Sequence, residues 1–228
     1  MTATTGYRDL RVVLPREWWF IPLDDAVRRD AAIAGIVDQQ YAGFDDQPLA
    51  KEAARKEIGA NARRATELGG RRMAYSLMSL AGLPFTATMT MYWHELGSPY
   101  GADHLADLYV SFLRELDEEA EDAEAALADG RPVPQVPEVG LARSEVAAGP
   151  VLRRVTEATG GDDIGTGLPA YEAAATVPVL LAEYWVPIPD GSGLAQLSFS
   201  TGLVTWRDQV VEFFDAVVGT ASWVQRED

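Results

Sequence analysis

Apolar and polar residues alternate most regularly in the C-terminal third of the chain. Two extended runs, residues 177–189 and 194–201, flank the tetrapeptide Asp190-Gly191-Ser192-Gly193. Glycine tolerates the positive φ angles of tight turns, so this tetrapeptide favours a reverse turn. In the second run Leu197 and Phe199 alternate with serines, the period-2 pattern of a strand with one buried face. We therefore predict a β-hairpin.

A helical pattern follows this hairpin and extends to Trp223. Its apolar residues recur at steps of three and four, which places them on one face: Trp206, Val210, Phe213, Phe214, Val217, Val218 and Ala221. Thr205 and Asp208 have the spacing of a capping box, which predicts the helix start.

Similar patterns predict the remaining elements. Short strands at Leu10–Val13 and Trp18–Leu23, separated by Pro15, are expected to form a first hairpin. Two helices are expected next: the first is capped by Asp24 or Asp25 and runs to about Tyr41, and the second runs from Pro48 to Leu68. A strand pair, Met73–Leu80 and Phe85–Trp93, and a helix from Asp103 to near Gly130 follow. A further strand pair is expected at Val139–Ala147 and Val151–Glu157.

Hairpins rather than β-α-β crossovers dominate this order of elements. That order predicts an α+β fold, in which an antiparallel sheet built from hairpins carries helices packed against it. The 228 residues are expected to form a single domain, with a Pro-rich connector near residues 130–138.

The C-terminal segment also resembles a known fold group. EYWVPIPDG (183–191), LSFSTGL (197–203) and FFDAVVGTASW (213–223) resemble the end of actinobacterial proteins assigned to the α/β/α sandwich shared by PsbP, LpqN-type lipoproteins and DcrB-type secretion chaperones. The resemblance covers about a fifth of the chain. It implies a PsbP-like sandwich and a binding, assembly or chaperone role, and it implies no catalytic residues.

Composition excludes several classes of function. The chain has no cysteine, hence no disulfide, thiolate nucleophile or Cys-based zinc site. No apolar run reaches the length of a membrane-spanning helix, and the polar start does not resemble a signal segment. We expect a cytoplasmic protein without membrane insertion. A net charge of −16 disfavours nucleic acid as a partner.

Charge is distributed unevenly along the chain. Residues 114–129 hold eight acids against one arginine, a net charge of −7, whereas residues 51–72 hold seven basic residues against three acids, a net charge of +4. One interpretation is that both segments are solvated helix faces. The alternative is that the two segments face each other as complementary surfaces within or between subunits. Glu118 and Glu121 in the acidic segment are therefore partner-binding candidates.

Adjacent Trp18 and Trp19 are the other partner-binding candidates. Neighbouring residues of a strand point to opposite faces, so one tryptophan needs a covering helix and the other needs a second layer or a partner.

The segment WHELGSPYGADHLAD holds the clearest donors for a metal ion: His94, Asp103, His104 and Asp107. Imidazole and carboxylate groups are acceptable ligands for zinc, iron or manganese, but no HExxH spacing fixes their geometry. The alternative is that Asp103 caps a helix and both histidines are ordinary surface residues.

These observations favour a non-enzymatic protein-binding module without a cofactor. We expect an adaptor or chaperone-like accessory of a bacterial secretion or phage-like assembly, with a protein partner or self-association. Two alternatives are a metal-dependent or small-molecule enzyme using the region of His94 and His104, and a structural assembly component.

Overall fold

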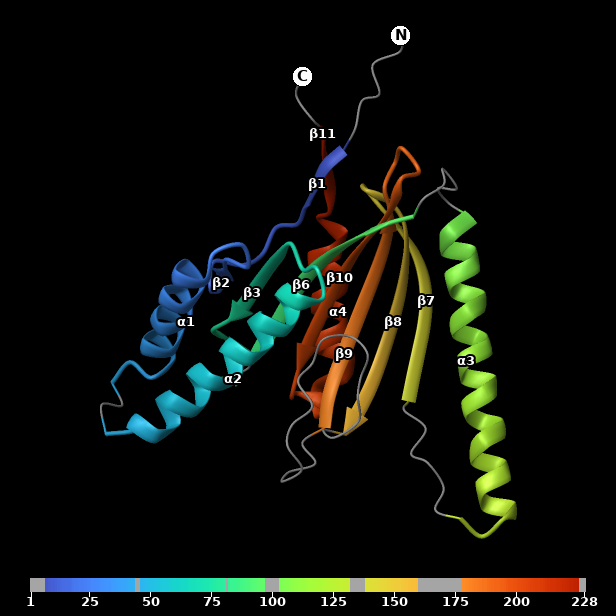
Figure 1. The fold of residues 1–228 in the computed structure, drawn as a ribbon, viewed down its shortest axis with the longest axis horizontal. Coiled ribbons are helices and arrows are strands. Elements are labelled where there is room, and N and C mark those ends of the chain that lie inside the picture. Colours follow the sequence, from blue (N-terminus) through green and yellow to red (C-terminus); the bar gives the residue numbers. More distant parts are fainter. Residues whose placement is uncertain are drawn as a thin grey trace.

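The structure is a computed structural model that describes residues 7–43, 46–80, 82–96, 103–131, 138–159 and 178–225. Its centre is a seven-stranded sheet in which every neighbouring pair is antiparallel (Figure 1). In order across the sheet, the strands are β2 (Trp18–Ile21), β3 (Arg72–Ser76), β6 (Ala87–Glu95), β10 (Gly193–Thr201), β9 (Pro178–Pro187), β8 (Gly149–Thr159) and β7 (Glu138–Val146).

One face of the sheet packs against α4 (Arg207–Gly219), which lies behind the sheet in Figure 1. The alternating apolar residues of the central strands point to this side, as the period of 2 requires. They include Met89, Tyr184, Leu197 and Phe199, which join Phe214 of α4 in the largest cluster of buried residues. Burial of this cluster is the main contact that holds the helix on the sheet.

Three helices cover the other face. Helices α1 (Ala26–Gln40) and α2 (Pro48–Glu67) pack over β2 and β3, and α3 (Asp103–Ala128) packs over β8 and β9. Asp25 caps α1, because its carboxylate accepts hydrogen bonds from the N–H groups of Val27 and Arg28. The molecule therefore has three layers, with the sheet in the middle.

Two small ribbons complete the face that α4 occupies. Strands β4 (Met78–Leu80) and β5 (Leu83–Phe85) form one, and β1 (Tyr7–Arg11) with β11 (Ser222–Gln225) forms the other. The prediction of a first hairpin is wrong, because β1 pairs with the last strand and β2 pairs with β3.

The start and end of α4 also differ from the sequence prediction. A single 3-10 turn, Val204–Trp206, precedes α4, and no side chain caps the helix, so Thr205 and Asp208 form no capping box. The helix ends at Gly219, and Trp223 lies on β11 instead, where its indole N–H donates to the carbonyl oxygen of Ala148 at 2.8 Å.

The predicted fold class is confirmed as α+β with a large antiparallel sheet. The particular likeness to PsbP stays a prediction. Most of the expected Pro-rich connector, residues 132–137, lies outside the described residues. Among the helices described, none combines the length and the apolar character needed to span a membrane.

Candidate functional site

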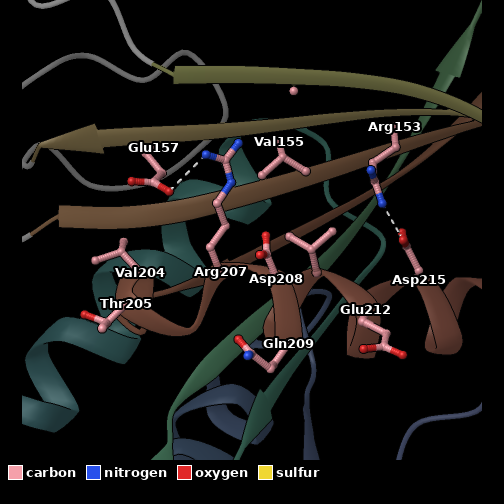
Figure 2. A pocket seen from close by; sticks show the side chains of 12 residues that line it. Arg153, Val155, Glu157, Val204, Thr205, Arg207, Asp208, Gln209, Glu212 and Asp215 are labelled. Carbon is pink, nitrogen blue, oxygen red and sulfur yellow. Dashed lines mark hydrogen bonds and ion pairs between the residues drawn. The ribbon is translucent and has the colours of Figure 1, made fainter.

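A groove with a cavity volume of about 750 Å³ lies between α4 and the β7–β8 hairpin (Figure 2). It exists because α4 packs over the centre of the sheet, where Phe214 stacks on Phe199 of β10 with 4.5 Å between ring centroids. Strands β8 and β7 extend the sheet beyond the helix. Among the residues that the structure describes, no element covers part of their α4-facing surface.

Charged side chains dominate the lining of this groove. The complete lining is Gly140, Arg153, Val155, Glu157, Val204, Thr205, Arg207, Asp208, Gln209, Val211, Glu212 and Asp215. Four carboxylates and two guanidinium groups give a net charge of −2. Val155 and Val211 are nearly buried, and Gly140 of β7 adds no side chain above the strand, so the floor is apolar and low.

Two ion pairs bridge the sheet and the helix across the groove. Arg153 of β8 pairs with Asp215 of α4, and Nη1 of Arg207 lies 3.3 Å from Oε1 of Glu157 of β8 (Figure 2). These pairs place one guanidinium group at each end of the groove. Each arginine already has a carboxylate next to it.

A buried tyrosine fixes the position of Asp215. The hydroxyl of Tyr184 on β9 donates to Oδ1 of Asp215 at 2.8 Å. Burial, reinforced by the neighbouring carboxylate, raises the pKa of Tyr184, so its hydroxyl remains a donor under ordinary conditions. One wall of the groove is thus attached to the core of the sheet.

Asp208 and Glu212 differ from the other two carboxylates of the groove. They lie one turn apart on α4, and both are exposed. Neither has an ion-pair partner among the residues that the structure describes. The wall formed by α4 therefore presents two uncompensated negative charges to the open side of the groove.

A second polar arrangement lies on the opposite face of the sheet. The amide nitrogen of Gln196 on β10 donates to Oε1 of Glu183 on β9 at 2.8 Å, and the amide oxygen of Gln196 lies 2.7 Å from Nε2 of His94 on β6. Glu183 is 1% exposed. The hydrogen-bonded chain links the exposed end of β6 to a carboxyl group in the interior.

Burial dominates the chemistry of Glu183. It raises the pKa of this carboxyl group to about 7, although Arg154 on the adjacent strand and the amide of Gln196 act in the opposite direction. Arg154 itself lies over the ring of Phe112 and 3.5 Å from Glu115, both on α3. Glu183 thus titrates near neutral pH in a region that joins the sheet to α3.

The candidates for a metal site lie on two different elements. His94 lies at the end of β6, hydrogen-bonded to Gln196, whereas His104 and Asp107 lie on the first turns of α3. The side chain of Asp103 lies outside the described ones. In the described parts of the chain, no three His, Asp or Glu side chains come together as a metal site would require. The metal hypothesis gains no geometric support.

The partner-binding candidates occupy different environments. Trp18 is 5% exposed and packs beside Phe199 and Phe213, so it belongs to the core. Trp19 is 43% exposed on the edge strand β2. Glu118 and Glu121 are exposed on α3, outside the groove.

The groove did not stand out in the sequence, because Arg153 and Arg207 occupy ordinary charged positions of a strand and a helix, and Thr205 and Asp208 are interpreted as a capping box. Glu183 did give a signal, since it is a charged residue inside the apolar run VLLAEYWV. Comparison of the chain with protein-family models and with curated proteins gave no match.

Proposed function

We propose that this protein is a protein-binding module that receives a helix of its partner in the groove between α4 and the β7–β8 hairpin. The observation that carries this proposal is a part of the α4-facing side of the sheet that no described element covers. Apolar strand surface is stabilised when another element packs on it, so an open strip beside a helix has room for a further helix.

The dimensions of the strip suit one helix. Because adjacent strands lie about 4.8 Å apart, the two outer strands provide roughly 10 Å of width, which equals the usual distance between packed helices. Residues 153–157 of β8 extend for about 14 Å, the length of two to three helical turns. An amphipathic helix that lies in a groove is a recurrent mode of protein recognition.

The character of the lining supports a protein rather than a small molecule as the ligand. Sites for small molecules are mostly apolar and enclose their ligand, with a few converging polar groups. This groove is open and is lined mainly by charged and polar residues around a short apolar floor. The groove shares with protein interfaces the arrangement of a small apolar centre and a polar rim that stays accessible to solvent.

Photo-crosslinking followed by reconstitution tests the proposal. A photoreactive residue at Gln209, within the groove, is expected to crosslink a partner in the native cell, whereas the same residue at Glu121 of α3 is not. The identified partner is then purified and titrated against the protein. Gly140→Phe, which fills the groove, should weaken binding at least tenfold, and Glu121→Phe should leave it unchanged. Equal binding by both variants contradicts the proposal.

A further inference from the structure

The charges of the groove restrict which helix it accepts. Arg153 and Arg207 are matched by Asp215 and Glu157, so the two arginines leave no positive charge in excess. Asp208 and Glu212 remain as the excess charge, about 6 Å apart along the axis of α4. An acidic partner would add repulsion to a wall that is already negative.

Complementary charges are what such a wall favours in a partner. Opposite charges that meet across an interface speed association and select the correct partner, and like charges exclude wrong ones. Side chains one turn apart on a second helix have the same spacing as Asp208 and Glu212. Two basic residues at positions i and i+4 can therefore face both carboxylates at once.

We infer that the helix bound in the groove is basic and amphipathic, with two Lys or Arg residues one turn apart opposite Asp208 and Glu212. This inference rests on the proposed function. The apolar side of the bound helix lies against the partly exposed Val204 and over the low floor at Val155 and Val211, and its basic pair lies along α4. The partner is thereby identified as a segment that combines an apolar stripe with flanking positive charge.

The acidic segment of α3 carries more negative charge than the groove but lacks its shape. Glu118 and Glu121 are exposed on a helix and line none of the groove. A protein of net charge −16 attracts any cation at long range. The location of binding, and not its mere occurrence, therefore distinguishes a recognition site from general attraction.

Three synthetic helical peptides of about 15 residues test the inference, because shorter isolated helices are marginally stable in water. The peptides share one leucine stripe and differ only in an i, i+4 pair, which is Lys, Gln or Glu. Each is titrated at physiological salt into the full chain and into two variants. Asp208→Asn/Glu212→Gln neutralises the groove wall, and Glu118→Gln/Glu121→Gln removes the same charge from α3 as the matched control.

We expect the Lys peptide to bind most tightly and to lose roughly three- to tenfold in affinity when the groove wall is neutralised, the effect of two exposed ion pairs. The α3 variant should bind the Lys peptide as the wild type does. Asp208→Lys/Glu212→Lys should instead prefer the Glu peptide, which separates charge recognition from misfolding.

Equal losses in the groove and α3 variants overturn the inference, and so does a Gln peptide that binds as tightly as the Lys peptide. A Lys peptide that does not bind at all overturns it as well. In that case the proposed function still stands if the crosslinked partner binds the groove through a neutral segment. If the Lys peptide does not bind and Gln209 gives no crosslink, both proposals fail.

Discussion

Glu183 links the stability of this fold to pH. Its carboxyl group is buried on β9, and its pKa is about 7 in the folded protein against an ordinary value of 4.5. Below pH 4.5 the group is protonated in both the folded and the unfolded chain, so its stabilising effect is fully present. Between pH 4.5 and about pH 7 only the folded protein keeps this proton, so the free energy of unfolding decreases until the pH passes 7.

Replacement of Glu183 by Gln is expected to remove this dependence. The amide keeps an acceptor for Gln196 but does not ionise. Relative to the variant, the wild type should lose about 2–3 kcal/mol in the free energy of unfolding between pH 5 and pH 8, roughly the value of the shift in pKa. Urea denaturation across this range measures the difference. The same dependence of the free energy of unfolding on pH in both proteins would contradict this role of Glu183. Glu145→Gln, at an exposed position of β7, serves as the control.

Phe214 makes an equally local contribution through packing. Its ring is fully buried against Phe199, Phe85 and Phe213. Phe214→Ala should cost about 3–5 kcal/mol in the free energy of unfolding, because it removes a large buried ring and leaves a cavity. Thermal and urea denaturation measure this loss. A variant as stable as the wild type would show that α4 is not attached through this ring.

Among the elements, α1 offers a test of which residue caps its N-terminus. The sequence allowed either Asp24 or Asp25, and the structure selects Asp25, whose carboxylate accepts two backbone N–H groups at 2.8 and 3.0 Å. Asp25→Ala should cost about 1 kcal/mol in the free energy of unfolding. Asp24→Ala, at the neighbouring exposed position, should cost little. Equal effects of the two changes would contradict the assignment.

Most helices and strands were predictable, because each depends on a local pattern. The periodicity of residues 48–68 and the alternation of residues 85–93 appear within single segments, and both elements form close to the expected ranges. Pairing was less accessible. Strand β1 joins β11 at the far end of the chain, and no local signal of Leu10–Val13 specifies a partner more than two hundred residues away.

The two wrong predictions for α4, its capping box and its end at Trp223, also arise because a local pattern does not show tertiary packing. Thr205 and Asp208 have the correct spacing for a capping box, but the 3-10 turn over Val204–Trp206 shifts the start of the helix beyond Thr205. Trp223 was expected to end the helix and yet lies on β11, where Trp93 and Tyr7 pack against its ring. Tertiary packing thus overrides a local pattern at both ends of this helix.

At the scale of the whole molecule, the groove results from unequal coverage of the two sheet faces. Three helices pack on one face, and α4 with two ribbons packs on the other (Figure 1). A sequence pattern shows which side of a strand is apolar, but it does not show which part of a sheet lacks a covering element. The sequence therefore does not predict that these residues come together as a groove.

Binding of a partner helix between α4 and the β7–β8 hairpin can be observed by amide chemical-shift mapping of the labelled protein during titration with the Lys peptide. Shifts are expected to be concentrated in β7, β8 and α4, with little change in α1, α2 and the acidic half of α3. Shifts centred on the acidic half of α3, or spread over the whole surface, would contradict it.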